Sequence, residues 1–323
     1  MIIKQKTKRL NKTPLINWYK KHGRHDLPWR TTTNSYHIYL SEIMLQQTQV
    51  KTVLERFYFQ FLEKFPTLES LANATQDEVL KAWEGLGYYA RARNLHKTAQ
   101  LLKSQLPQSV EELHALPGIG PSTANAIACF AFGASVPILD GNVKRILYRY
   151  YKTKVANDKK LWELSHKLFK ANENLAYEHN QALMDIGSMV CTRTQPKCEI
   201  CPLHDKCEGK SSPLEYPTKK VKKTKEIRER CLVIYTCKEE VALFQNQSNL
   251  LKGLWSFVQY SDDVDENEYT YKGQIKHEYS HISLRARVYT KEVEKKHFEN
   301  WFDEVEIQTI ALSKADYKAL SLL

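Results

Sequence analysis

Apolar residues recur at helical spacing through the first 211 residues, and short turns separate these stretches. Thr13 before Pro14 is typical of a helix start, and Thr75 followed by Glu78 is typical of a capping box. Few strand patterns interrupt this part of the chain, so we expect a mostly α-helical region. The expected helices cover residues 14–23, 37–49, 75–84, 88–94, 121–133 and 143–151.

The pattern changes near residue 230. Four stretches have the alternation or the composition of β-strands, namely residues 232–235, 241–244, 254–260 and 282–289. A helix capped by Ser313 follows them. We therefore expect a small α+β domain over residues 230–323.

A basic segment, residues 212–229, connects the two regions. It contains two prolines and a run of four lysines, Lys219, Lys220, Lys222 and Lys223. This composition predicts a linker that either crosses the phosphates of a polyanion or is a solvated tether.

The most distinctive stretch begins with the turn Leu-Pro-Gly-Ile-Gly at residues 116–120, which is followed by a proline at the first position of a helix. Glycine accepts positive φ, so the backbone N–H groups near Gly118, Gly120 and Ser122 should point outward. A helix start with exposed N–H groups binds phosphate. The turn therefore predicts a phosphate contact.

Asp140 follows an apolar segment and precedes Gly141, Asn142 and another expected helix. An aspartate before a helix is commonly an N-cap. Its position also suits a working carboxylate at the edge of a cleft, and both interpretations stay open from the sequence.

Two further stretches hold polar residues in unusual places. Glu42, Gln46 and Gln47 lie among apolar neighbours, which indicates either a row of polar side chains facing a cleft or the solvent-exposed face of a helix.

Tyr88 and Tyr89 precede two arginines. This arrangement suits a ring wedged between stacked bases with arginines on phosphates, or a buried aromatic pair with solvated arginines.

The net charge of +11 is unevenly distributed. Residues 1–230 hold 37 Lys and Arg against 22 Asp and Glu, while residues 231–323 hold 11 against 15. The basic part is the expected polyanion-binding surface. The sequence has no run of 18 apolar residues and no apolar core of a secretory signal near its start, so we expect no membrane partner and a location in the cytoplasm, associated with the nucleoid.

Four cysteines follow the spacing Cys-x6-Cys-x2-Cys-x5-Cys, and they are Cys191, Cys198, Cys201 and Cys207. In a chain without an export signal such a cluster indicates metal ligands rather than disulfides. Zinc and a four-iron cluster both accept four thiolates, and the spacing alone does not choose between them.

Together these residues resemble the adenine DNA glycosylases of the MutY family, a branch of the helix-hairpin-helix glycosylases. The matching motifs are LPWR at 27–30, SEIMLQQTQV at 41–50, GLGYYARARNL at 85–95, LPGIGPSTANAI at 116–127, ILDGNVKR at 138–145, NQALMDIG at 180–187 and the four cysteines. The resemblance covers nearly the whole chain. It implies a helical glycosylase region over residues 1–211 and a Nudix-like domain over residues 230–323, with a helix-hairpin-helix at about 110–133 and an iron-sulfur loop at 191–207.

The resemblance also implies a [4Fe-4S] cluster on the four cysteines. The expected partner is double-stranded DNA in which adenine faces 8-oxoguanine or guanine, and the expected protein is a monomer. The implied reaction is hydrolysis of the bond between that adenine and its deoxyribose.

This hydrolysis needs two carboxyl groups in different environments. We expect Glu42 to be the general acid toward adenine N7, because burial raises a carboxyl pKa. Asp140 should stay ionised, held by Asn142 and the adjoining helix start, and stabilise the cationic sugar. The adenine must leave the duplex to reach them.

By resemblance, other residues take roles around the extruded base. Leu27, Trp29, Arg30 and Asp185 line its pocket, Gln47 and Tyr88 fill or wedge the stack, and Gly118, Gly120 and Ser122 contact the DNA. The residues that read 8-oxoguanine are Tyr279, Ser280 and His281.

Three alternatives were open. Endonuclease III has a nucleophilic lysine at the position of Ser122, so we expect a monofunctional enzyme rather than a bifunctional lyase. A non-catalytic mismatch binder would use Glu42 and Asp140 only structurally. A nucleotide hydrolase would need a Gly-x5-Glu-x7-Arg-Glu box, and residues 231–323 contain none.

Overall fold

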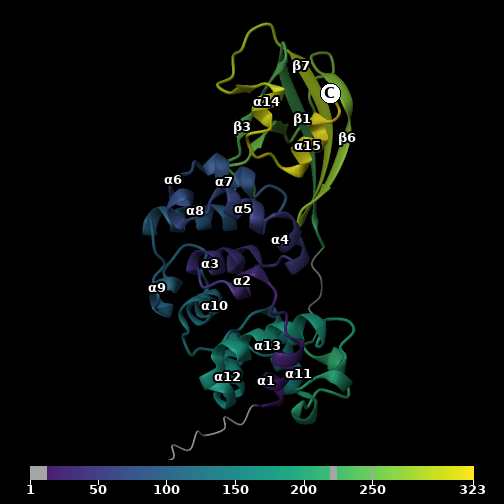
Figure 1. Ribbon diagram of the computed structural model, residues 1–323. Helices are drawn as coiled ribbons and strands as arrows, with labels where there is room; N and C mark the ends of the chain where they lie inside the picture. Colours follow the sequence, from purple (N-terminus) through teal and green to yellow (C-terminus); the bar gives the residue numbers. More distant parts are fainter. Residues whose placement is uncertain (1–12, 219–223, 249) are drawn as a thin grey trace, which may run out of the picture. The chain divides into compact units, whose positions relative to one another are not determined.

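The computed structural model describes residues 13–218, 224–248 and 250–323 (Figure 1). The chain divides into two compact units. Unit 1 takes in the described residues of Met1–Glu42 and Leu106–Val221, and unit 2 those of Ile43–Gln105 and Lys222–Leu323. Each unit is therefore assembled from two separate parts of the sequence. The four linker lysines named above lie outside the described residues.

Unit 1 is helical throughout its described part. Its α-helices are α1 (Pro14–His22), α2 (Pro28–Thr31), α3 (Ser35–Met44, which ends two residues inside unit 2), α9 (Val110–His114), α10 (Pro121–Phe132), α11 (Gly141–Tyr150), α12 (Asp158–Phe169) and α13 (Ala176–Met189). Four short 3-10 helices complete it: η1 (Lys170–Leu175), η2 (Cys198–Ile200), η3 (His204–Lys206) and η4 (Pro213–Glu215).

Helix α13 is the central element of this unit, because α1, α10 and α11 all pack against it. Figure 1 shows α1, α11 and α12 gathered around it. The shared core includes Leu15 from α1, Val143 and Leu147 from α11, and Leu183 and Ile186 from α13. Burying one such side chain contributes about 1.5–3 kcal/mol. This core fixes the start of α11, where Asp140 lies.

Unit 2 combines helices with a sheet. Its first part contributes α4 (Val50–Arg56), α5 (Tyr58–Lys64), α6 (Leu68–Asn73), α7 (Gln76–Ala82) and α8 (Ala90–Leu102). Thr75 caps α7 in the predicted capping box with Glu78. Two glycines with positive φ, Gly85 and Gly87, separate α7 from α8.

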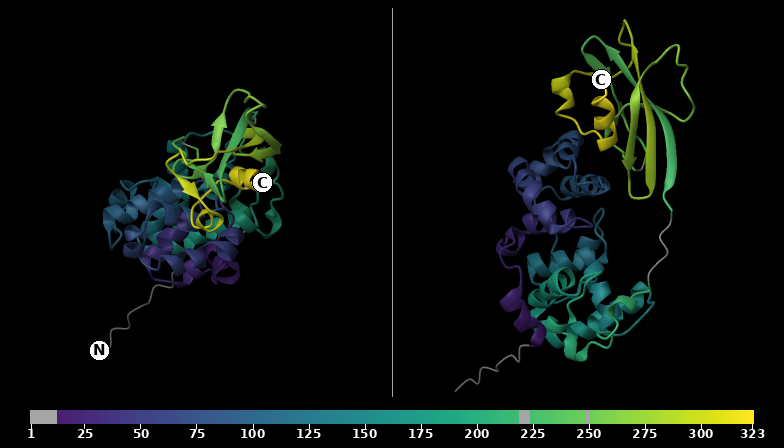
Figure 2. Two further views of the ribbon diagram at one scale, coloured as in Figure 1. Left: turned by 90° about the horizontal axis from the view of Figure 1, so that it is seen from above. Right: turned by 90° about the vertical axis from the view of Figure 1, so that its right-hand side faces the viewer.

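The strands of unit 2 are β1 (Glu226–Cys237), β2 (Glu240–Ala242), β3 (Phe244–Gln245), β4 (Trp255–Ser256), β5 (Val258–Tyr260), β6 (Thr270–Glu278), β7 (Ile282–Glu292) and β8 (Trp301–Phe302). The main sheet has the order β6-β7-β1-β2-β8, and β5 also pairs with β1. Strand β1 is parallel to β7, while β6 and β7 form a long antiparallel hairpin (Figure 2). Residues 279–281 form the tip of that hairpin.

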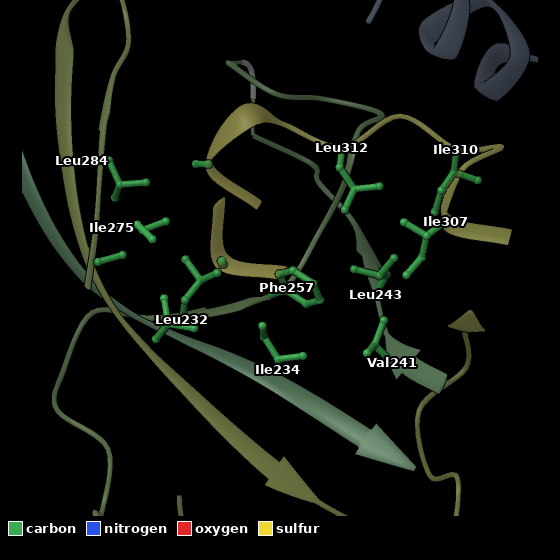
Figure 3. Packing of buried hydrophobic residues seen from close by; sticks show 14 residues of the cluster. Leu232, Ile234, Val241, Leu243, Phe257, Ile275, Leu284, Ile307, Ile310 and Leu312 are labelled. Carbon is green, nitrogen blue, oxygen red and sulfur yellow. The ribbon is translucent and has the colours of Figure 1, made fainter. Parts of the chain in front are cut away.

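Two short helices, α14 (Glu304–Ile307) and α15 (Lys314–Leu320), cover one face of this sheet. Figure 3 shows Leu232 and Ile234 of β1 and Leu284 of β7 pointing toward the segment that carries Ile307 and Leu312. The alternation along β1 puts every second side chain into this core.

The structure corrects several expected boundaries. Residues 28–31 form a short helix that was not among the expected ones, and α3 ends at Met44 instead of residue 49 because Gln47 takes a left-handed conformation. Tyr88 and Tyr89 precede α8 rather than belonging to it. Strand β1 begins at Glu226, inside the expected linker, and β6 was missed.

Within the described part of the chain, none of the helices has the length and apolar character needed to cross a bilayer.

Candidate active site

Glu42 lies on α3 between the buried residues Ser41 and Ile43. Part of its side chain is still solvent accessible, yet burial is the largest of the causes that raise its pKa to about 7. The negative charge of Asp140 raises it further, and the Arg30 guanidinium opposes both. A carboxyl with this pKa keeps its proton in about half of the molecules at neutral pH and can donate it.

Asp140 is the N-cap of α11, so the N-cap interpretation of this residue is confirmed. Its Oδ1 accepts the Val143 N–H at 2.7 Å, and its Oδ2 accepts the Asn142 side-chain amide at 3.3 Å. Burial raises its pKa, but these donors and the Arg145 guanidinium act in the opposite direction. The capping role does not exclude a catalytic one, because the carboxylate also acts electrostatically on Glu42.

Asp140 accepts hydrogen bonds from more donors than Glu42 does. When two carboxyl groups share one proton, the proton goes to the group with fewer hydrogen bonds to its ionised form. The geometry therefore favours neutral Glu42 beside ionised Asp140.

Asn142 is held on both sides. Its Oδ1 accepts a hydrogen bond from Arg145 at 2.8 Å, and the same guanidinium donates to the Gly187 carbonyl at 2.5 Å. A Cβ on Gly187 would lie 2.4 Å from the Asn142 Cβ, so only glycine fits between α11 and α13 at this point. Residue 187 thus determines where Asn142 can lie.

Three of the four residues expected to line the adenine pocket lie near the start of unit 1, and the fourth, Asp185, comes from α13. Leu27 is buried just before α2, and Trp29 is buried within that helix. Asp185 of α13 is 0% exposed, and Arg30 donates to both of its oxygens at 2.8 and 2.9 Å. Arg24 adds an ion pair of 2.6 Å. Although burial acts to raise it, these guanidinium groups hold the pKa of Asp185 below its usual range.

Both oxygens of Asp185 are therefore engaged by the protein itself. This ties α13 to the segment before α3, and Arg30 in turn acts on Glu42. The lining of an adenine pocket by these residues stays a prediction.

The hairpin before α10 takes the expected form only in part. Gly118 has φ 74°, whereas Gly120 has φ −80° and caps α10 without positive φ. The space where a Cβ of Gly120 would lie is open. The Ser122 hydroxyl accepts the Leu139 N–H at 3.1 Å and so fixes the residue before Asp140.

A second group of predicted residues meets in unit 2. Gln47 and Tyr88 line a pocket of about 710 Å³ together with Tyr279, Ser280 and His281 at the tip of the β6–β7 hairpin. The Ser280 hydroxyl donates to the Tyr88 phenol oxygen at 3.3 Å. The structure therefore brings the expected wedge residues and the expected reading residues to one pocket.

Neither sequence-based interpretation of the two tyrosines and their arginines is right as a whole. Tyr88 is 48% exposed, whereas Tyr89 is buried at 9%. Arg91 is buried rather than aimed at phosphates, and burial lowers its pKa to about 10. Arg93 donates to the backbone carbonyl of Lys252.

The four cysteines line one small pocket, with Arg149, His204 and Pro213 around them. The Arg149 guanidinium donates to the Cys191 sulfur at 3.2 Å, and the backbone N–H groups of Leu203 and Gly209 face two more of the sulfurs. Burial raises the pKa of Cys201 to about 11. Burial therefore favours the thiol form of Cys201 over the thiolate.

The sequence interpretation missed Arg24, Arg145 and Arg149. Arg145 and Arg149 both donate to the carbonyl of Cys191, which connects α11 to the cysteine loop. Arg145 lies three residues after Asn142 inside a motif that was singled out. This helical spacing could have identified it as the partner of Asn142.

Comparison with known proteins agrees with this geometry. The model of the HhH-GPD superfamily of base excision DNA repair proteins matches residues 40–171. The adenine DNA glycosylase of Buchnera aphidicola subsp. Schizaphis graminum is 33% identical over 339 aligned positions, covering 95% of this chain and 97% of the relative. That of the subsp. Baizongia pistaciae is 45% identical over 202 residues, 60% of this chain and 57% of the relative. The human adenine DNA glycosylase is 38% identical over 214 residues, 61% of this chain and 38% of that protein.

The fold has solved counterparts. A thermostable thymine-DNA glycosylase matches with a TM-score of 0.56 and 28% identity, covering 61% of this chain and 94% of that one. An endonuclease III–DNA complex matches with a TM-score of 0.52 at 23% identity, which shows the shared fold. The near full-length relative, the repair-family match and the paired carboxyl groups agree. The chain therefore belongs to the MutY family of adenine DNA glycosylases and is a DNA glycosylase of base excision repair.

Proposed function

We propose that this protein hydrolyses the N-glycosidic bond of an adenine that faces 8-oxoguanine or guanine in double-stranded DNA, and that it acts as a monofunctional monomer. The observation that carries the proposal is the pairing of Glu42 and Asp140, in which burial and the charge of Asp140 raise the pKa of Glu42 to about 7, while the Val143 N–H and the Asn142 amide donate to Asp140. Such a substrate fits the expected location in the cytoplasm, associated with the nucleoid.

In the proposed reaction, Glu42 donates its proton to N7 of the extruded adenine. The bond between N9 and C1′ then breaks, and its electron pair leaves with the base. Asp140 stabilises the oxocarbenium-like sugar through its negative charge. A water molecule then adds to C1′ and gives its proton to the Glu42 carboxylate, which restores Glu42 and leaves free adenine and an abasic site. Each 1.4 kcal/mol of stabilisation changes the rate tenfold.

Asn142 and Arg145 orient Asp140 rather than reacting themselves. The Asn142 side-chain amide donates to Asp140, and Arg145 donates to the Oδ1 atom of Asn142. Leu27, Trp29 and Arg30 belong to the proposed base pocket, with Asp185 holding Arg30 in place. Gly118, Gly120 and Ser122 are proposed contacts to the DNA backbone.

The pocket of unit 2 is proposed to hold the base opposite the adenine. Tyr88 is the exposed aromatic ring that would enter the stack, with Gln47 beside it. Ser280 and His281 offer the donors and acceptors that can distinguish 8-oxoguanine from guanine.

The cysteine pocket is proposed to hold a [4Fe-4S] cluster. Cys191, Cys198, Cys201 and Cys207 all line it and would be the ligands. When bound, the cluster would supply the positive charge that keeps the thiolates ionised, and Arg149, which donates to the Cys191 sulfur, would support that charge balance.

The test measures adenine release by the purified protein from duplexes with adenine opposite 8-oxoguanine, guanine or thymine. We expect release from the first two and none from the third. Glu42→Gln should bind the same DNA and release no adenine. Binding of the A:8-oxoguanine duplex without release by the unmodified protein would contradict the proposal and support the mismatch binder, while strand cleavage without heat or base would support the lyase.

A further inference from the structure

Arg91 makes six hydrogen bonds within unit 2, although the sequence suggested either a contact to DNA phosphates or a solvated side chain. It is 8% exposed. Its Nη1 donates to the carbonyls of Ile43, Met44 and Gln46 at 3.0, 2.7 and 2.6 Å. Its Nη2 donates to the Thr48 hydroxyl at 3.2 Å and to the carbonyls of Leu86 and Gly87 at 3.3 and 3.0 Å. One guanidinium thus connects two loops that are about 40 residues apart in sequence.

These two loops carry the backbone strain of the pocket. Gln47 has φ 58° and Tyr88 has φ 51°, and neither is glycine. The left-handed conformation costs a residue with a Cβ about 1 kcal/mol or more, so the surrounding contacts must hold it. The backbone groups beside both residues, Gln46 and Gly87, are the ones that Arg91 binds.

The guanidinium also lies against the ring of Tyr88. The Arg91 Cζ atom is 5.5 Å from the centroid of the Tyr88 ring and 5.3 Å from the centroid of the buried Trp83 ring. Such cation–π contact fixes the direction of an exposed ring. Lysine has neither the five donors nor the planar shape needed to replace these contacts.

We propose that Arg91 is the positioning residue that holds Gln47 and Tyr88 in the geometry needed to open the base stack. This inference rests on the proposed function, because it assigns Arg91 to the step that extrudes the adenine. Arg91 itself touches neither the DNA nor the reacting atoms. Its role is to make two strained loops rigid, so that the ring of Tyr88 enters the duplex at a fixed angle.

The test compares two substrates under single-turnover conditions with enzyme in excess. In the first, adenine faces 8-oxoguanine in a duplex. In the second, the same adenine lies in an unpaired bubble and is already unstacked. We expect Arg91→Lys to lower the excision rate on the duplex at least about tenfold and the rate on the bubble by less than about threefold.

Arg93→Lys is the matched control, since Arg93 is on the same helix and its guanidinium donates to the Lys252 carbonyl. The excision rates of this variant should stay within about twofold of the unmodified protein on both substrates. Where Arg91→Lys fails to fold, Thr48→Val removes one acceptor of the guanidinium and should slow the duplex reaction about threefold with the bubble reaction unchanged. Equal losses on the two substrates, or no loss on the duplex, would overturn the role of Arg91. No adenine release by the unmodified protein from either substrate would instead overturn the proposed function.

Discussion

The negative charge of Asp140 helps to raise the pKa of Glu42 to about 7, so the two residues of the proposed reaction influence each other before any substrate binds. Glu42 comes from α3 and Asp140 from the N-cap of α11, about 100 residues later in the sequence. Their coupling gives predictions that distinguish a catalytic pair from two structural carboxyl groups.

The excision rate of the unmodified protein should fall as pH rises through about 7, because ionised Glu42 has no proton to donate. Asp140→Asn keeps an acceptor for the Val143 N–H but removes the charge. The rate should fall about 100- to 1000-fold. The decline of the remaining activity with rising pH should begin at a lower pH than in the unmodified protein, because the pKa of Glu42 falls without the charge of Asp140. Single-turnover rates between pH 5.5 and 8.5 measure both effects. A decline at the same pH in Asp140→Asn and in the unmodified protein would contradict the coupling.

Glu42→Gln should change stability with a definite dependence on pH. In the unfolded chain Glu42 titrates at its ordinary pKa of 4.5, and in the folded chain at about 7. Between these values the folded state binds more protons, so the unmodified protein loses stability as pH rises through this window. Glutamine does not titrate. The melting temperature of Glu42→Gln relative to the unmodified protein should therefore rise by about 2–4 °C from pH 4.5 to pH 7.5, after discounting for partial exposure. The exposed Glu55→Gln should show no such trend.

Gly187→Ala should displace Asn142, since the added methyl group would meet its Cβ at 2.4 Å. Neither α11 nor α13 can move without disturbing the core of unit 1. We expect at least tenfold slower adenine excision together with a lower melting temperature. Ser188→Ala, at the next and exposed position of α13, should leave both nearly unchanged. Normal activity of Gly187→Ala would show that the position of Asn142 is unimportant.

Asp185→Asn should destabilise the protein by about 3 kcal/mol, because it leaves the Arg30 guanidinium buried without its counter-charge. The Arg30 side chain is only 4% exposed, so water cannot replace the carboxylate. Urea unfolding measures the change. Asp158→Asn breaks the more exposed pair with Lys144 and should cost no more than about 1 kcal/mol.

Protein isolated without oxygen should be brown and contain about four iron atoms per chain. Cys201→Ser should lose the colour and most of the iron, because it removes one of the four proposed ligands, all of which line one pocket. Cys237→Ser, in the buried part of β1, should keep both. A colourless protein with one zinc ion would contradict the assignment of the cluster.

Local patterns predicted several helix starts. Thr75 and Ser313 cap helices as expected, because capping depends on neighbouring residues only. Thr13 also precedes a helix, but its hydroxyl donates to Asn172 instead of capping it. The raised pKa of Glu42 also followed from its apolar neighbours along the sequence.

Features that depend on distant residues could not be predicted. Nothing near Arg91 in sequence indicates that its guanidinium is used by carbonyls at positions 43, 44 and 46. The ion pair of Asp185 with Arg30 and the close approach of Gly187 to Asn142 likewise depend on how helices pack. Strand β6 was missed because its exposed positions interrupt the alternation of apolar residues.

The pocket of unit 2 takes Gln47 and Tyr88 from the first third of the chain and Ser280 from its last part. A ribosome therefore releases Glu42, Asp140 and all four cysteines long before the hairpin tip that completes this pocket. A chain whose translation stops early would carry the proposed catalytic residues without the proposed reading residues.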